Sequence, residues 1–333
     1  MDTRRCFFLQ IDDLENPGKR GTGEAAPIAG LSEEDEQRVV SDLALLKARL
    51  TDGNVELPGT ITGAGEIGEQ LGLCSSVRFA FEMAVAELSS GRTGFYFDAP
   101  LHKGVPVPVN GLVWMAGTRE MKRQAQAKAG QGYRCIKFKV GGQSFEEECE
   151  MLSWVRETDW GKGLQIRLDA NGAFGAGDVM EKLERLAAFG IHSIEQPVRA
   201  GQRELMKVVC SGSPIPVALD EELIGVYGEG AYRLIADLKP AYLVIKPSLH
   251  GGFSGTLKWK SIAEQAGLGW WLTSSLESPL GLSALSQFTS SLGVTLAQGL
   301  GTGEIYSDGG TGAVEVRADR KSTRLNSSHI TIS

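Results

Sequence analysis

Several features that define common protein classes are absent from this 333-residue sequence. The five cysteines are odd in number and never form C-x-x-C, so neither a zinc knuckle nor a disulfide framework is indicated. No apolar run approaches the roughly 20 residues that cross a bilayer, and the N-terminus lacks the apolar segment of a signal peptide. The 41 acidic residues outnumber the 34 basic ones, so the charge balance attracts no nucleic acid. We expect a cytoplasmic protein with reduced thiols and no nucleic-acid or membrane partner.

Familiar catalytic and cofactor signatures are also missing. Neither G-x-S-x-G nor H-E-x-x-H occurs. The segment Gly63–Gly68 matches the dinucleotide pattern G-x-G-x-x-G, but no apolar strand precedes it, and we predict a loop there. The sequence does have an ordinary hydrophobic content of 42%, which is enough to form a buried core.

Residues 1–105 predict a small α+β domain. A strand is expected at Cys6–Ile11, and a loop at Gly21–Glu24. One helix is expected to begin at Ser32, where acidic residues follow a capping serine, and a second to cover Ser75–Leu88.

From residue 106 to 317, short apolar strands alternate with amphipathic helices. This alternation predicts a parallel sheet, and eight strands fit a closed (β/α)8 barrel of the TIM type better than an open doubly wound sheet. The predicted strands are Val107–Trp114, Tyr133–Val140, Leu164–Asp169, Ser193–Gln196, Val217–Asp220, Tyr242–Lys246, Trp270–Ser274 and Val294–Ala297. Capping signals predict helices after Ser144 and after Ser278. Residues 318–333 are polar without periodicity, and we expect this tail to lie outside the fold.

Charged side chains stand at the ends of five consecutive predicted strands. They are Lys137 and Lys139, then Asp169, Glu195, Asp220 and Lys246. Active sites of barrel enzymes lie at the carboxyl ends of the strands. Each residue alone could belong to a structural ion pair, but burying all of them costs several kcal/mol per ion unless they are paired or bind a metal. The set therefore predicts an active site.

The three carboxylates predict a metal site. Asp169, Glu195 and Asp220 offer hard oxygen ligands on neighbouring strands, which suits Mg²⁺, with Mn²⁺ as an alternative ion. Zinc is disfavoured because no His or Cys joins the set.

The lysines predict proton transfer. Lys137 and Lys139 are two residues apart on one strand, so both face the barrel interior, and Lys246 reaches in from the opposite side. Nearby positive charge lowers the pKa of a lysine and makes it a better base. This arrangement predicts proton abstraction α to the carboxylate of a small-molecule substrate.

Seven short motifs carry a resemblance to a known family. They are Gly21–Glu24, Ile136–Lys139, Leu168–Asn171, Ile194–Pro197, Leu219–Glu221, Ile245–Pro247 and Thr273–Ser278. Together they resemble the enolase superfamily, in its muconate-lactonizing-enzyme-like branch, over most of the chain. Within that branch, Ser274–Ser278 and Gly299–Gly303 are most similar to the o-succinylbenzoate synthases, in the form found in Bacteroidetes.

The resemblance implies that residues 1–105 cap the barrel and that the carboxylate triad binds Mg²⁺. It implies that Lys139 moves the proton, Lys137 helps to hold the substrate carboxylate, and Lys246 stabilises the enediolate from the other face. Ser274, Ser275, Gly299 and Gly301 would contact substrate, with Asn171 and Glu221 behind the metal ligands. The implied reaction is the dehydration of 2-succinyl-6-hydroxy-2,4-cyclohexadiene-1-carboxylate to 2-succinylbenzoate in menaquinone biosynthesis.

Two departures and two alternatives accompany this interpretation. Gly172 stands where many of these synthases have arginine, and the first strand of the cap and its loop are not recognisable before Cys6, so we expect an incomplete cap.

A dipeptide epimerase or N-acylamino acid racemase would use the same triad and lysines. A non-catalytic metal-binding relative is a more remote alternative, because it would need no strand-end amines. The sequence gives no signal for the oligomeric state.

Overall fold

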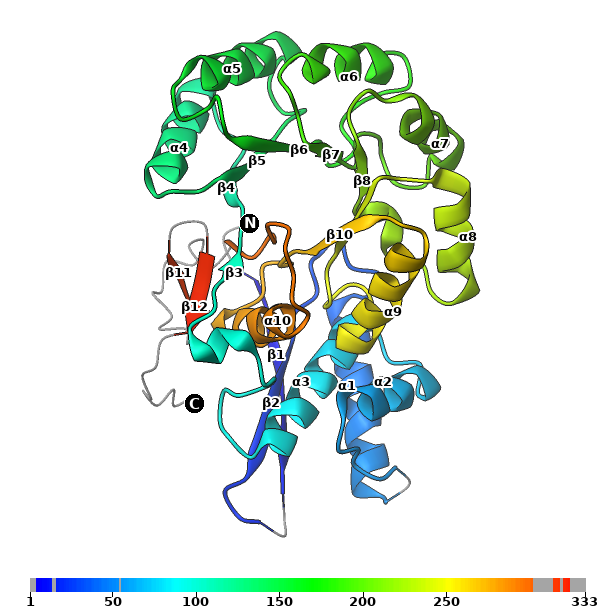
Figure 1. Ribbon diagram of the computed structural model, residues 1–333. Coiled ribbons are helices and arrows are strands. Elements are labelled where there is room, and N and C mark those ends of the chain that lie inside the picture. The colour runs from blue at the N-terminus through cyan, green and yellow to red at the C-terminus, as the bar shows by residue number, and fades with distance from the viewer. Residues whose placement is uncertain (1–3, 14–15, 54, 302–313, 318–319, 324–333) are drawn as a thin grey trace.

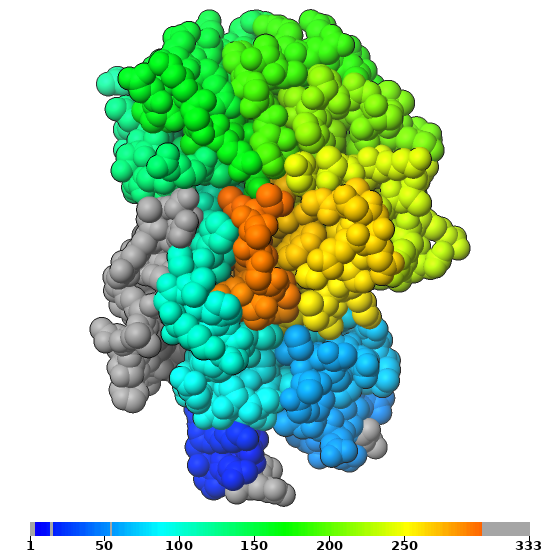
Figure 2. Space-filling view, viewed as in Figure 1, coloured from blue at the N-terminus to red at the C-terminus, as the bar shows by residue number. Residues whose placement is uncertain are grey.

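The computed structural model describes residues 4–13, 16–53, 55–301, 314–317 and 320–323, and it has two parts (Figure 1). Helices α1–α3 and the β1–β2 pair lie at one end, and a curled parallel sheet surrounded by helices lies at the other. The space-filling view shows the first part, in blue and cyan, packed directly against the second, in yellow and orange (Figure 2). No helix within these ranges is long and apolar enough to cross a membrane.

The described residues form a seven-stranded parallel sheet with its strands in chain order. The strands are β4 (Gly111–Val113), β5 (Cys135–Lys139), β6 (Gln165–Asp169), β7 (Ser193–Glu195), β8 (Val217–Leu219), β9 (Tyr242–Ile245) and β10 (Gly269–Leu272). Single parallel bridges, Val109 to Gln298 and Thr273 to Gly299, connect the two edges. The fold class predicted from the sequence, a (β/α)8 barrel with an N-terminal α+β domain, is confirmed.

Two strand predictions need correction. The eighth strand, expected at Val294–Ala297, is reduced to the bridges at Gln298 and Gly299 just beyond it. The first, expected at Val107–Trp114, is divided into β3 (Val107–Pro108) and β4. Between β3 and β4, the backbone amide of Asn110 donates a hydrogen bond to the carbonyl of Gln298, and this contact helps to close the barrel.

Helices cover the outside of the barrel (Figure 1). They are α4 (Thr118–Gly130), α5 (Phe145–Glu157), α6 (Val179–Ala187), α7 (Arg203–Gly212), α8 (Glu229–Leu238), α9 (Gly252–Gln265) and α10 (Pro279–Ser291), with the short 3₁₀ helices η1 (Pro100–Lys103) and η2 (Glu221–Leu223). The predicted helix starts are confirmed: Ser144 forms a capping box with Glu147, and the Ser278 side chain accepts from the Leu280 amide.

The barrel interior is filled below its mouth. Arg167 on β6 is fully buried, with its guanidinium 3.8 Å from the centre of the Trp271 ring and a hydrogen bond to the carbonyl of Ala297. Ala218 and Val244 pack against the same tryptophan. These side chains form a floor that confines polar chemistry to the carboxyl ends of the strands.

The N-terminal part pairs β1 (Phe7–Asp12) with β2 (Arg20–Ala25) beside α1 (Glu36–Thr51), α2 (Ile61–Gln70) and α3 (Ser75–Ser90). The loop predicted at Gly21–Glu24 is therefore wrong, because these residues lie in β2. An added Cβ at Gly21 or Gly23 would stand 1.8 Å from a backbone oxygen of α3, so the strand packs too closely for any other residue.

Two helix predictions in this part also need correction. The first helix begins at Glu36 rather than Ser32, because Asp35 caps it by accepting from the Arg38 amide. The loop predicted at Gly63–Gly68 lies within α2, which Thr60 caps. Gly65 is there because a Cβ would stand 2.2 Å from the hydroxyl oxygen of Ser254 on α9.

Residues 318–333 were expected to lie outside the fold, but four of them form a strand that pairs with other strands. β12 (Arg320–Thr323) pairs with β11 (Val314–Arg317) and, through Arg320 and Lys321, with β3. The other residues of the tail, and Thr302 and Gly303 of the glycine-rich segment, lie outside the described residues.

The packing of β2 on α3 gives a stability prediction. Gly23→Ala should lower the free energy of unfolding by about 1–3 kcal/mol, because the strand must move away from the helix backbone. Gly59→Ala is the matched control, since a Cβ there meets no atom within 4 Å. Urea denaturation measures both, and equal stability of the two variants would contradict the packing argument.

Candidate active site

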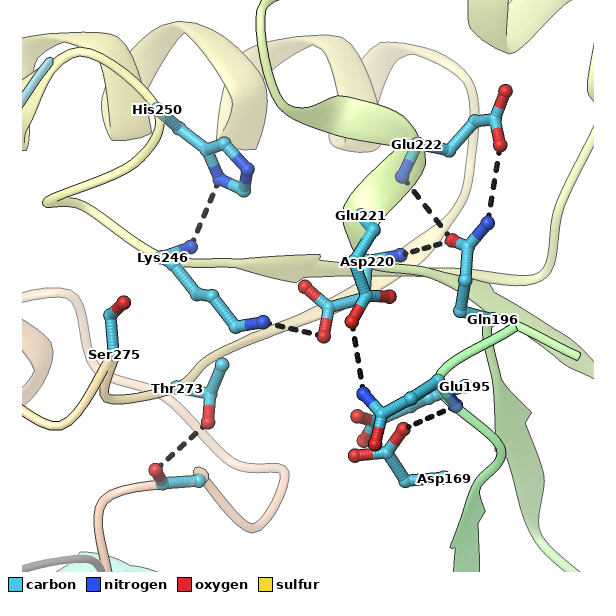
Figure 3. Close-up of polar contacts among 12 residues, drawn as sticks. Asp169, Glu195, Gln196, Asp220, Glu221, Glu222, Lys246, His250, Thr273 and Ser275 are labelled. Carbon is cyan, nitrogen blue, oxygen red and sulfur yellow. Dashed lines mark hydrogen bonds and ion pairs between the residues drawn. The ribbon is translucent and has the colours of Figure 1, made fainter. Parts of the chain in front are cut away.

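The register of the parallel strands brings the predicted charged residues to one level. Lys139 is opposite Asp169, and Asp169 is opposite Glu195, on β5, β6 and β7. Asp220 follows β8 and Lys246 follows β9. All three carboxylates are almost fully buried. Figure 3 shows Asp169 and Glu195 on one side of the mouth, with Asp220 and Lys246 pointing toward one another.

Lys137 bridges two of the carboxylates. Its Nζ lies 2.7 Å from Oε2 of Glu195 and 3.1 Å from Oδ2 of Asp169. Burial alone would lower the pKa of Lys137, but Asp169 and Glu195 raise it above its ordinary value. Burial would likewise raise the pKa of Asp169, yet the ammonium groups of Lys137 and Lys139 hold it well below the usual range. Lys137 is therefore a fixed positive charge in this arrangement.

Lys139 lies nearer to solvent and has different partners. Its Nζ is 3.2 Å from Oδ2 of Asp169 and donates to Oδ1 of Asn171. The Asn171 amide in turn donates to Oε1 of Glu221 over 2.9 Å. The Trp114 ring, partly exposed at the end of β4, has its centre 5.8 Å from the Lys139 Nζ. Lys139 thus lies beside an aromatic surface on which a planar substrate could rest.

Lys246 reaches in from the far side of the barrel. Its Nζ lies 2.6 Å from Oδ2 of Asp220. Burial would lower the pKa of Lys246, but Asp220 and Glu221 raise it. Three strands separate β9 from β5 in the sheet, so Lys246 and Lys139 face each other across the mouth.

The carboxylate triad has buried oxygens that are suited to binding a divalent cation. Oε1 of Glu195 and Oδ1 of Asp220 are buried and accept no hydrogen bond from any described residue. Burial raises the pKa of Glu195 to about 7, against the opposing charge of Lys137. A cation at these oxygens would offset that cost. Among the described residues, no three His, Cys, Asp or Glu side chains are arranged to hold a metal ion as they stand. The carboxylates are paired with lysines instead, Asp169 and Glu195 with Lys137 and Asp220 with Lys246.

Gln196 is a residue to which the sequence interpretation gave no role. It follows Glu195 with a positive φ of 39°, and its Oε1 accepts from the backbone amides of Asp220 and Glu222. Its Nε2 donates to Oε2 of Glu222 (Figure 3) and to the carbonyl of Val198. Gln196 therefore orients the turn that presents Asp220. Its place in the Ile194–Pro197 motif was the available signal.

His250 follows the sixth predicted strand, where the sequence alone favours a histidine at the surface, and the structure corrects that expectation. It is buried, and its Nδ1 accepts from the backbone amide of Lys246 over 3.0 Å. The imidazole thus fixes the turn that carries Lys246 (Figure 3).

The residues predicted to contact substrate differ in whether their polar groups already form hydrogen bonds within the protein. Ser274 donates its hydroxyl to Glu277, whereas Oγ of Ser275 is buried without a hydrogen-bond partner among the described residues. Gly299 closes the barrel, since its carbonyl accepts from the Ser274 amide and the Thr273 hydroxyl. A Cβ on Gly301 would come within 3.1 Å of a backbone oxygen. Ser275 is the member of this group best placed to bind a ligand.

Two acidic residues hold the loop that carries these serines. Glu277 accepts from the hydroxyls of Ser248 and Ser274 and from the Ser275 amide, over 2.6–2.8 Å. Glu24, from β2, accepts from the amides of Ser278 and Gly281 at the start of α10. The N-terminal part therefore reaches the barrel mouth directly.

The chain matches the family model "Enolase C-terminal domain-like" over residues 120–318. It is 37% identical over 330 residues to an o-succinylbenzoate synthase of Desulfotalea psychrophila, which covers 92% of this chain and 89% of the relative. The chain belongs to the enolase superfamily.

Two further comparisons separate branches of this superfamily. The crystal structure of MenC from Desulfotalea psychrophila LSv54 superposes with a TM-score of 0.87 and 36% identity, over 96% of this chain and 94% of the other. The L-Ala-D/L-Glu epimerase of Bacillus subtilis is 26% identical over 174 residues, 52% of this chain and 47% of the epimerase. The similarity to the synthase is therefore both higher and more extensive.

The Glu277 network gives a prediction. Glu277→Gln should lower the free energy of unfolding by about 1.5–3 kcal/mol, because hydrogen bonds to a charged acceptor are lost and an amide donor meets another donor. Glu264→Gln is the control, since that residue pairs with Lys260 at the surface. Urea denaturation would contradict the account if the two variants lost equal stability.

Proposed function

We propose that this protein is an o-succinylbenzoate synthase of menaquinone biosynthesis. It is a hydro-lyase that converts 2-succinyl-6-hydroxy-2,4-cyclohexadiene-1-carboxylate to 2-succinylbenzoate. The observation that carries the proposal is the 37% identity over 92% of the chain to a synthase. Amines on opposite sides of a buried carboxylate triad support it, because such a mouth suits proton removal beside a carboxylate.

The proposed reaction removes one proton and one hydroxide from neighbouring ring carbons. The Lys139 amine accepts the proton from the carbon that bears the carboxylate, and the electron pair of that C–H bond moves into the enediolate. The pair then returns to the ring as the C–O bond at carbon 6 breaks. Lys139 gives its proton to the departing hydroxide, so water leaves, the ring becomes aromatic and the amine is restored.

The other residues stabilise charge during this step. Lys137, held by Glu195 and Asp169, presents fixed positive charge to the carboxylate end of the substrate. Lys246 presents a second ammonium from the opposite side of the mouth. Ser275, whose hydroxyl has no hydrogen-bond partner among the residues that the structure describes, would bind the succinyl carboxylate.

Asp169, Glu195 and Asp220 would hold Mg²⁺ or Mn²⁺, through oxygens that include Oε1 of Glu195 and Oδ1 of Asp220. When bound, the ion supplies positive charge at the substrate carboxylate while the proton leaves.

Racemisation of an acylamino acid or dipeptide is the second candidate activity. The facing amines of Lys139 and Lys246 favour it, because proton removal on one face and return on the other inverts a carbon centre. Two assays of the same protein distinguish the two activities: aromatisation of the ring of the synthase substrate, and deuterium exchange into N-succinyl amino acids and dipeptides. Exchange without aromatisation would reject the synthase proposal.

Lys139→Ala should reduce dehydration by about 10²–10⁴-fold or more, because the group that both takes and returns the proton is lost. Turnover is followed by the ultraviolet absorbance of the aromatic product. Lys128→Ala on α4, a lysine outside the mouth, controls for loss of a positive charge. Near wild-type turnover in Lys139→Ala would assign proton transfer to another residue.

Asp220→Asn should weaken Mg²⁺ binding, because one anionic oxygen is lost from a site for a hard ion. Calorimetric titration of the protein with Mg²⁺ measures the change, with Asp237→Asn on α8 as the control. Equal affinity of both variants and the wild type would remove Asp220 from the metal site.

A further inference from the structure

A cavity of about 570 Å³ lies outside the barrel mouth, between the N-terminal part and helices α8 and α9. Glu69 of α2 and Arg78 of α3 line one side, and Tyr232 of α8 and Trp259 of α9 line the other. None of these residues takes part in the proposed dehydration. The cavity is large enough for a single-ring molecule with a short substituent.

The charged side chains of its wall leave an excess of positive charge. Glu69 pairs with both Arg78, whose Nη2 lies 3.0 Å from Oε1, and Lys258. Among the residues that line the cavity, two cations therefore face one carboxylate, with Glu82 of α3 as a further acidic neighbour of Arg78. Nε of Arg78 is buried with no partner within the described part of the chain. An anionic ligand would balance this charge.

His250 adds a second buried donor to the same wall. Its Nδ1 accepts from the Lys246 amide, so the neutral ring carries its proton on Nε2. Burial, with the nearby charge of Lys246, lowers the pKa of His250 to about 3, which keeps the ring neutral. Nε2 is buried and meets no acceptor among the residues described, although His250 lines the cavity. A buried donor without an acceptor is costly, and a ligand oxygen would satisfy it.

The rest of the wall is mainly apolar and aromatic. Tyr227, Tyr232 and Trp259 present ring surfaces, and Val226 and Ile262 lie among them. Tyr227 and Tyr232 are both partly exposed despite their size, so a ligand would also cover their apolar surface.

We propose that this cavity is a second ligand site, which binds a small carboxylate with a planar apolar body. The carboxylate accepts from Arg78 and His250, and the ring lies against the aromatic side chains. Because His250 also holds the Lys246 backbone, the ligand contacts a residue that positions the barrel mouth.

The test uses benzoate as the probe, with neutral benzamide and ringless acetate as comparisons, in calorimetric titrations of the full chain. Benzoate should bind more tightly than either. Lys258→Gln should weaken benzoate about threefold, the size of an exposed charge interaction, and Glu69→Gln should strengthen it by a similar factor. Lys260→Gln on the same helix is the matched control, because Lys260 does not line the cavity. Opposite changes from two surface substitutions cannot arise from partial unfolding.

A crystal soaked with 4-bromobenzoate locates the site by the anomalous signal of bromine. Bromine beside Trp259 is the expected result. Bromine at the barrel mouth alone, or equal benzoate affinity in Lys258→Gln, Glu69→Gln and Lys260→Gln, would overturn the proposal. Binding is measured without turnover, so the outcome is independent of whether the protein proves to be a synthase.

Discussion

Buried opposite charges at one level of the barrel are the interaction on which the rest of the structure depends. Each ion loses several kcal/mol of hydration when it is buried, and close pairing must offset that loss. The pairs Lys137–Glu195 and Lys246–Asp220, at 2.7 and 2.6 Å, satisfy this condition. The Lys137–Glu195 pair depends on the register of β5, β6 and β7, which places Lys139 beside Asp169 and Asp169 beside Glu195. A slip of one residue would turn each side chain to the other face of the sheet.

Neutral and acidic groups outside the network keep it in place. Gln196 holds the turn at Asp220, and His250 holds the turn at Lys246. The N-terminal part contributes Glu24 to the start of α10, and Glu82 of α3 accepts from the Ser254 amide at the start of α9. Burial raises the pKa of Glu82 to about 7, so the contact between the two parts includes a strongly desolvated carboxyl group. The mouth therefore depends on both parts of the chain.

The sequence predicted the barrel and the level at which the charged residues meet, because βα periodicity and strand-end position are local signals. It did not predict contacts between distant segments. Gly21–Glu24 looked like a loop, since only the close approach of α3 explains two glycines inside a strand. Gly63–Gly68 looked like a loop for the same reason, because α3 and α9 pack against α2 there. The burial of His250 could not be predicted from the sequence either, because its hydrogen-bond partner is a backbone amide. The roles of Lys139 and of the triad stay predictions.

The claim that Lys139 and Lys246 flank the substrate is central to this account. The most direct measurement is a crystal structure of the protein with Mg²⁺ and the product 2-succinylbenzoate. The account predicts the benzoate ring at the barrel mouth, with the Nζ atoms of Lys139 and Lys246 on its opposite faces and the succinyl group toward Ser275. A ring bound with both amines on one face, or bound away from Asp169, Glu195 and Asp220, would contradict it.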